Sequence, residues 1–187
     1  MKLNQTAYVL LGMLSVEGNQ SGYDLRKAVQ ESVGYFWGES YGQIYPTLKK
    51  LAAEGLITQS KSMTRARQNR QEYSLTEAGR ACLREWLALP FQNDPPRNEF
   101  LLKLFFGREA SPAVSIEHVR ELNRRNKAML ATLEGIEKYA LANPTRSPHQ
   151  PYWMLTLSLG LALTRAALEW GVSALATLEG AEAAGPL

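Results

Sequence analysis

The sequence is poor in the residues that build covalent or metal-bound frameworks. Cys82 is the only cysteine among 187 residues, and His118 and His149 are the only histidines. A single thiol excludes an intrachain disulfide, a CxxC pair and a thiolate metal cluster. Neither histidine has an evident acid or nucleophile partner, and Cys82 sits beside apolar residues, which favours a small buried side chain over a reactive thiol. We therefore expect no enzyme, no cofactor and no metal site.

The sequence also lacks a long hydrophobic run. Its longest apolar segment, 153–164, is about a dozen residues, whereas a membrane-spanning helix needs about 20. The N-terminal apolar stretch is too short and too polar at its flanks for a signal peptide. With 45% hydrophobic and 21% charged residues, the composition is that of a folded globular protein. We expect a cytoplasmic protein without a membrane partner.

A large charge excess is missing as well, because the formal net charge is only +3. Residues 1–89 nevertheless hold 11 Lys and Arg against 8 Asp and Glu, whereas residues 90–187 hold 10 of each. Within the first half, the segment KSMTRARQNR at 61–70 has four positive charges and no negative one. A basic half joined to a neutral half is typical of nucleic-acid binding. A solvated basic loop without a partner is the alternative.

Periodicity and turn residues divide the first half into three helices, a strand, a basic loop, a strand and a fourth helix. This order is that of a winged helix-turn-helix domain. Thr6, Ser21 and Thr76 are the expected N-caps, and Gly55 is expected to end the third helix. The predicted elements are helices over about 7–16, 22–33, 43–54 and 77–89, and strands over 56–61 and 71–75.

Helices alone are expected in the second half. The predicted fold class is therefore mainly α with a small β-hairpin: a winged helix-turn-helix domain followed by an all-helical dimerisation domain. The proline-rich stretch PFQNDPP interrupts the chain after the fourth helix. The predicted boundaries are a DNA-binding domain at 1–89, a linker at 90–97, a helical dimerisation or effector domain at 98–180 with helices over about 98–106, 115–142 and 152–179, and a flexible tail at 181–187.

The third helix contains a proline, Pro46, near its start. At 100° per residue, the apolar side chains share one face, while Pro46 lies on the opposite, polar and basic face. There its missing N–H is one of the unpaired groups of the first turn. This face and the basic loop predict a recognition helix and a wing, although an ordinary amphipathic surface helix is the alternative. The candidate DNA-binding residues are Tyr41, Gln43, Tyr45, Pro46, Thr47, Lys49, Lys50, Lys61, Arg65, Arg67 and Arg70.

The two long helices of the second half predict a dimer. From residue 119 onward, apolar residues recur at spacings of three and four, with Asn126 as a polar member of the seam. The last helix is apolar nearly all round and needs a covering partner, and Arg165 and Glu169 can pair with each other or across subunits. A helix packed only within its own subunit is the alternative. The candidate dimerisation residues are Leu122, Asn126, Met129, Leu133, Leu161, Arg165, Leu168 and Glu169.

Four tryptophans in so short a chain suggest a pocket for a planar ligand. Aromatic side chains more often belong to a core than to a ligand cage, so a packing role is the alternative. The candidate effector-pocket residues are Trp37, Trp86, Trp153 and Trp170.

Three strings over residues 7–89 resemble the winged-helix domain of the PadR family of transcriptional regulators: YVLLGMLSVEGNQSGYDLRKAV, GQIYPTLKKLAAEGLI and RQEYSLTEAGRACL. The matching motifs are Ser21–Leu25, Gly42–Leu48, Glu54–Ile57 and Tyr73–Gly79, whereas the wing, TRARQNRQ, departs from the commoner Gly-Arg-Pro-type tip. The second half resembles the helical dimerisation region of longer members.

This resemblance implies a homodimer that binds a palindromic operator in double-stranded DNA, usually as a repressor, and some members respond to phenolic or planar hydrophobic compounds. We therefore expect a DNA-binding transcriptional regulator whose operator binding is relieved by such an effector. A winged-helix protein-interaction module without specific DNA binding is the alternative. It is disfavoured because such modules tend to lose the basic wing and the polar recognition face.

Overall fold

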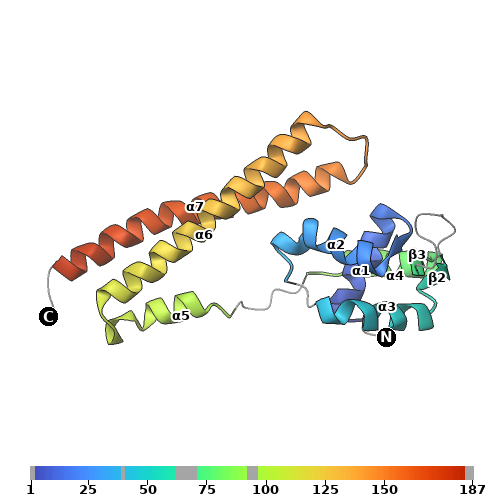
Figure 1. Ribbon diagram of the computed structural model, residues 1–187, viewed down its shortest axis with the longest axis horizontal. Coiled ribbons are helices and arrows are strands. Elements are labelled where there is room, and N and C mark those ends of the chain that lie inside the picture. Colours follow the sequence, from blue (N-terminus) through green and yellow to red (C-terminus); the bar gives the residue numbers. More distant parts are fainter. Residues whose placement is uncertain (1–2, 39–40, 62–70, 92–96, 184–187) are drawn as a thin grey trace. The chain divides into compact units, whose positions relative to one another are not determined.

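The chain divides into two compact units, Met1–Asn93 and Asp94–Leu187, and each is described by itself. The first unit consists of four helices and a small sheet, and the second consists of helices (Figure 1). This confirms the predicted mainly helical fold with a winged-helix part. The computed structural model describes residues 3–38, 41–61, 71–91 and 97–183.

In the first unit, helices and strands follow in the order expected for a winged helix. Two short 3-10 segments, η1 (Val33–Tyr35) and η2 (Tyr41–Gln43), separate the second helix from the third. The regular elements are α1 (Gln5–Glu17), β1 (Gln20–Ser21), α2 (Gly22–Glu31), α3 (Ile44–Ala53), β2 (Ile57–Lys61), β3 (Gln71–Leu75) and α4 (Glu77–Ala88).

The sheet contains one strand more than the predicted hairpin. Its order is β1-β3-β2, with both pairs antiparallel, and Ser21 lies opposite Glu72 while Ile57 lies opposite Leu75. A strand of two residues is too short to show a period of two in the sequence, so β1 was missed. The predicted inward direction of Tyr73 is confirmed, because that side chain is buried.

The helix N-termini are capped as predicted in two of three cases. The hydroxyl of Ser21 accepts a hydrogen bond from Asp24 N at 3.2 Å, and Thr76 caps α4 in the same way. The prediction for α1 was wrong. Asn4 is its cap and accepts from the backbone N–H of Ala7 at 3.0 Å, whereas Thr6 lies inside the helix and is buried. Both residues are good caps, and sequence alone did not separate them.

The C-terminus of α3 is tied to the start of α4. Gly55, with a φ of 70°, forms a Schellman ending in which Leu56 N donates to Leu51 O at 3.0 Å. The Thr76 hydroxyl then donates to the carbonyls of Gly55 and Leu56 at 2.8 and 2.9 Å. The position of α3 therefore depends on α4 as well as on the core, to which α3 contributes the fully buried Ile44, Leu48 and Leu51.

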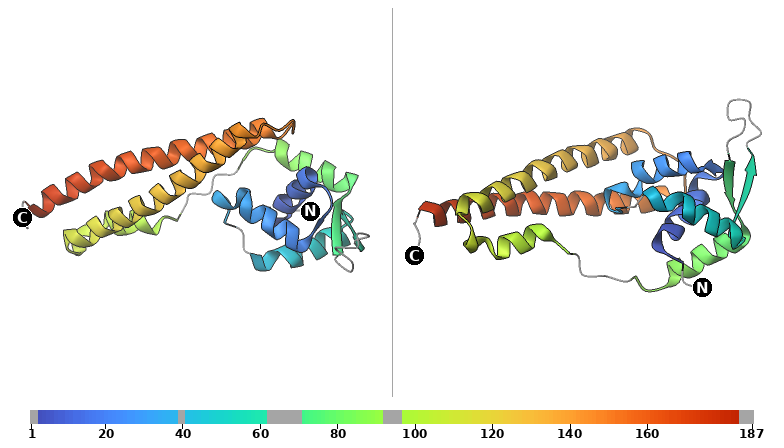
Figure 2. Two further views of the ribbon diagram at one scale, coloured as in Figure 1. Left: turned by 45° about the horizontal axis from the view of Figure 1, so that its top comes forward. Right: turned by 60° about the horizontal axis from the view of Figure 1, so that its bottom comes forward.

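The second unit is built around a helical hairpin of α6 and α7, which run antiparallel side by side in all views (Figures 1 and 2). Two exposed ion pairs join facing positions of these helices: Arg120 with Glu179, and Glu134 with Arg165, each at 3.0 Å. From the first pair to the second, the residue number rises along α6 and falls by the same amount along α7, as expected for antiparallel helices. The elements are α5 (Glu99–Phe105), the 3-10 segment η4 (Gly107–Glu109), α6 (Pro112–Ala142) and α7 (Gln150–Ala183).

This hairpin corrects part of the predicted dimer surface. Leu133 and Leu161 are 6% and 2% exposed within one chain, so a partner cannot reach them while α6 and α7 stay together. Among the described residues, Arg165 pairs with Glu134 and not with Glu169. The heptad seam is thus buried inside the chain at these positions, as in the alternative of packing within the subunit. A heptad pattern identifies a seam but not the chain that covers it.

Among the described residues, no helix combines the length and hydropathy that a membrane span requires. In the same part of the chain, no group of three or more His, Cys, Asp and Glu is arranged to hold a metal ion. The Cys82 thiol is half-buried, and burial raises its pKa, which favours the protonated form over the reactive thiolate.

Candidate nucleic-acid interface

The exposed side of α3 carries the polar and basic residues that the helical wheel placed there. Gln43, Pro46, Lys49 and Lys50 are all exposed, whereas the apolar residues of the opposite side are buried. Pro46 is the third residue of the helix, so its missing N–H is one of the four that an N-terminus leaves unpaired. The proline therefore costs the helix little and adds a rigid apolar surface to its outward side.

The predicted role of Thr47 in DNA binding does not fit the structure. The side chain is 5% exposed, so it has almost no surface to offer a nucleic acid. It lies on the flank of α3, between the buried and the outward sides, and neighbouring elements of the unit cover that flank.

Tyr45 lies on the other flank and is 49% exposed. Its ring lies against Gly22, the first residue of α2: a β carbon added there would stand 2.7 Å from Cε1 of the ring. Tyr45 therefore packs through one part of its ring while the rest remains accessible. Gly22 was not among the predicted site residues. The sequence signal that marks it is a glycine directly after the predicted N-cap Ser21, within the family motif Ser21–Leu25.

The two lysines of α3 differ in their surroundings. Lys50 lies 3.9 Å from Glu54, one helical turn later. The Glu54 side chain is 20% exposed, and its Oε2 is buried without a hydrogen-bond partner among the described residues. Lys49 has no carboxylate within ion-pair distance in that same part of the chain. Lys49 is thus free to bind an anion, whereas Lys50 has to leave Glu54 to do so.

The remaining predicted residues of this surface lie beside α3 or in the wing. Tyr41 begins η2, immediately before α3, and Lys61 is exposed at the end of β2, opposite Gln71. Arg65, Arg67 and Arg70 lie outside the described residues. They belong to the segment that joins β2 to β3.

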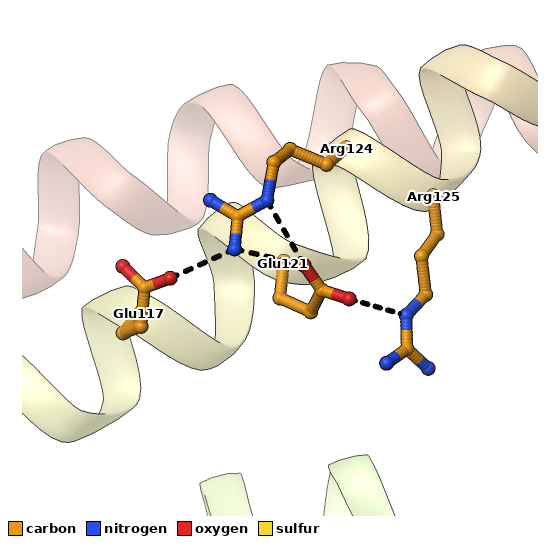
Figure 3. Close-up of polar contacts among 4 residues, drawn as sticks. All are labelled: Glu117, Glu121, Arg124 and Arg125. Carbon is orange, nitrogen blue, oxygen red and sulfur yellow. Dashed lines mark hydrogen bonds and ion pairs between the residues drawn. The ribbon is translucent and has the colours of Figure 1, made fainter.

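Several cations of the second unit pair with carboxylates, among them two arginines of α6 (Figure 3). On α6, Arg124 contacts Glu117 and Glu121 at 2.8 Å, and Arg125 contacts Glu121 at 2.7 Å. Hydrogen bonds from Arg125 and Arg124 lower the pKa of Glu121, so this carboxylate stays charged at neutral pH. The sequence places the positive charge excess in the first half of the chain, and this excess favours anion binding there.

The four tryptophans do not form one pocket in a single chain. Trp153 and Trp170 are 17 residues apart on α7, which at 1.5 Å per residue separates them by about 25 Å. Trp86 stacks on Tyr8 with ring centroids 4.5 Å apart, and Trp37 is half-buried after η1. Trp170 packs edge-on against Phe100 at 5.9 Å.

Trp170 also lines a groove of about 380 Å³ between α5 and α7. Its other walls are apolar, apart from two hydroxyl groups that already donate to their own helix. The lining residues are Leu104, Trp170, Ser173, Ala174, Thr177 and Leu178.

An apolar stripe on α7 is exposed within the second unit, with its last residue, Trp170, in contact with a ring of α5. Its residues share an arc of about 80° at 100° per residue, and each is at least 40% exposed. We call these residues the outer stripe: Tyr152, Leu155, Leu159, Leu163 and Trp170. Of the predicted dimerisation residues, Met129 and Glu169 are exposed, whereas Leu122, Asn126 and Leu168 are half-buried. None of the outer-stripe residues was among the predicted dimerisation residues.

Comparison with known proteins identifies the family. Residues 10–85 match the Transcriptional regulator PadR-like family, and residues 96–179 match the family described as Virulence activator alpha C-term. The chain is 33% identical over 138 residues to the negative transcriptional regulator PadR of Bacillus subtilis, covering 73% of this chain and 75% of that one. The chain belongs to the PadR-like family of transcriptional regulators.

Solved structures of the Bacillus subtilis protein are similar to this PadR-like chain over nearly its full length. The structure in complex with operator DNA has a TM-score of 0.80 at 30% identity, covering 94% of this chain and 99% of that chain. The structure in complex with p-coumaric acid has a TM-score of 0.76 at 30% identity, covering 92% and 98%. The predicted family and fold are confirmed.

Proposed function

We propose that this chain is a homodimeric repressor that binds a palindromic operator through α3 and the wing and is released by a small phenolic or planar hydrophobic effector. It acts in the cytoplasm, and we assign no catalysis to it. The supporting observation is the outward side of α3, where Gln43, Pro46 and Lys49 are exposed beside the half-exposed Tyr45. The operator complex of the Bacillus subtilis relative supports the same assignment.

The surface on α3 fits the two parts of DNA recognition. Small and polar groups at the first turn suit base edges in the major groove, and lysines further along suit phosphates. Arg65, Arg67 and Arg70 add positive charge beyond β2, where a wing contacts the phosphate backbone or enters a minor groove. Base contacts then supply sequence preference, and phosphate contacts supply salt-dependent affinity.

The test is binding of the purified protein to its own upstream DNA and to a scrambled duplex of equal length, at several salt concentrations. We expect tighter binding to the upstream DNA and a steep loss of affinity with salt. Lys49→Ala should flatten the salt slope by about one per protomer, and so by about two for the dimer. Lys138→Ala, which removes an exposed lysine of α6, is the matched control and should change nothing. Equal affinity for both duplexes would contradict the proposal and favour a protein-interaction module.

The wing and the recognition helix should be separable by mutation. Arg65→Ala together with Arg67→Ala removes phosphate contacts, so affinity for both duplexes should fall and the salt slope should flatten. Gln43→Ala should instead change which operator sequences are preferred, measured with a set of single-base operator variants. Normal binding by the wing double variant would contradict the phosphate assignment.

The outer stripe supports dimerisation. A row of large apolar side chains on one side of a 34-residue helix is costly to leave in water, and a second copy offers the same stripe. We expect Leu163→Glu to yield monomers in sedimentation equilibrium, because a charge in an apolar interface is costly. Leu141→Glu is the matched control, since Leu141 is 70% exposed at the end of α6 and outside the stripe. A dimer of unchanged strength in L163E would place the interface elsewhere.

Among the described residues, the groove beside Trp170 is the most suitable site for an effector. An aromatic ring can stack on or pack beside the indole, and the groove is mostly apolar. The p-coumaric acid complex of the relative supports the ligand class. We expect p-coumaric acid to release the upstream DNA and Trp170→Phe to weaken this release, whereas Trp153→Phe should not. Release that is equally strong in W170F would place the effector site elsewhere.

A further inference from the structure

Gly22 lies at the first position of α2, against the Cε1 edge of the Tyr45 ring on α3. A β carbon on Gly22 would stand 2.7 Å from Cε1 and 3.4 Å from Cδ1 and Cζ of that ring. Carbon atoms that are not bonded pack at about 3.5–4.0 Å. Every residue except glycine therefore places an atom where the ring now lies.

Neither backbone at this contact is free to move apart. Ser21 pairs with Glu72 in the sheet and caps α2 through Asp24 N, which holds the backbone on one side of Gly22. On α3, Ile44 and Leu48 have no exposed surface and hold the helix in the core. The half-exposed Tyr45 ring is therefore the group that yields, and its exposed side lets it turn outward.

We infer that Gly22 is a positioning residue for operator reading, because it seats the Tyr45 ring and so fixes the surface that α3 presents to base edges. This inference rests on the proposed function. A ring turned outward stands between α3 and the floor of the groove, so that the first turn of α3 cannot approach the bases as closely. Phosphate contacts made by lysines and by the wing need less exact placement. Sequence discrimination therefore falls while non-specific binding remains.

The experiment compares the full-length wild type with Gly22→Ala, Tyr45→Ala and the double variant, on upstream and scrambled DNA at one salt concentration. Gly12→Ala is the matched control, because a β carbon on Gly12 meets nothing within 4 Å. We expect G22A to lower the ratio of the two affinities by roughly five- to a hundredfold, the range that one misread base pair costs. In the Y45A background, the same change should lower the ratio no further.

Two DNA-binding results would overturn the inference: an unchanged ratio in G22A, or an equal fall in both backgrounds, which would mean that Gly22 acts without Tyr45. The seat is also measurable without DNA. A nuclear Overhauser cross-peak should join the Gly22 Hα and Tyr45 Hε protons, because the contact lies at Cε1 of the ring. Absence of this cross-peak in the wild type overturns the contact even if G22A fails to fold. Equal affinity of the wild type for both duplexes overturns the proposed function instead, and the cross-peak separates that failure from a missing contact.

Discussion

Gly79→Ala should lower the stability of the first unit, because the new methyl group would clash with backbone atoms. Gly79 is buried on the first turn of α4, and a β carbon there would overlap the carbonyl oxygen of Leu56 and stand 2.8 Å from Cδ1 of Leu75. That carbonyl accepts hydrogen bonds from the hydroxyl and the backbone N–H of Thr76. Because the obstacle is backbone, α4 has to move away from the end of α3.

The size of the effect follows from three terms. Overpacking against a fixed neighbour costs about 1–3 kcal/mol. Displacing α4 weakens the Thr76 cap, a loss of about 1 kcal/mol. Alanine returns about 1 kcal/mol of helix propensity. The expected loss in the free energy of unfolding is thus about 2 kcal/mol, and at ~4–8 °C per kcal/mol the unit should melt roughly 8–16 °C earlier.

The assay is thermal unfolding of the full chain, combined with hydrogen exchange followed by peptide, so that α1–α4 are resolved from α6 and α7. Exchange should accelerate in the first unit and stay unchanged in the hairpin of the second. Gly12→Ala is again the control, and we expect it to be neutral or slightly stabilising, since no atom opposes the new methyl group. A G79A protein that melts with the wild type would refute the packing argument.

Three further predictions concern the α6–α7 hairpin. Gly171→Ala places a β carbon against the Asn123 side chain, 2.6 Å from Nδ2, so it should lower the melting temperature, and Asn123→Ala in the same chain should restore most of the loss. Asn126→Leu should raise the free energy of unfolding by about 1 kcal/mol, because the Asn126 Nδ2 is buried without a partner among the described residues; a lower stability would mean that this amide is bonded in the dimer. Glu121→Gln should reduce stability only above the folded-state pKa of Glu121, which hydrogen bonds from Arg125 and Arg124 lower. The difference from the wild type should be present at neutral pH and vanish as the pH falls through that pKa; a difference that persists in acid would show that charge is not its cause.

Local signals account for the parts of the fold that the sequence predicted well. Ser21 and Thr76 cap helices because their hydroxyls reach an N–H only three residues away. Gly55 ends α3 because it adopts a positive φ at low cost. The outward placement of Pro46 and Lys49 follows from helical periodicity once the apolar side is buried. Each of these depends on neighbours within one or two helical turns.

The sequence by itself thus determined the winged-helix order, the family and the polar side of α3. The tertiary structure decided which surfaces remain available. It buried Thr47, paired Arg165 with a carboxylate 31 residues away, and enclosed Leu133 and Leu161 between α6 and α7. It also brought Gly22 against the edge of the Tyr45 ring. The physical reason is that periodicity specifies which side of a helix is apolar, whereas the element that covers it is set by long-range packing that no local pattern encodes.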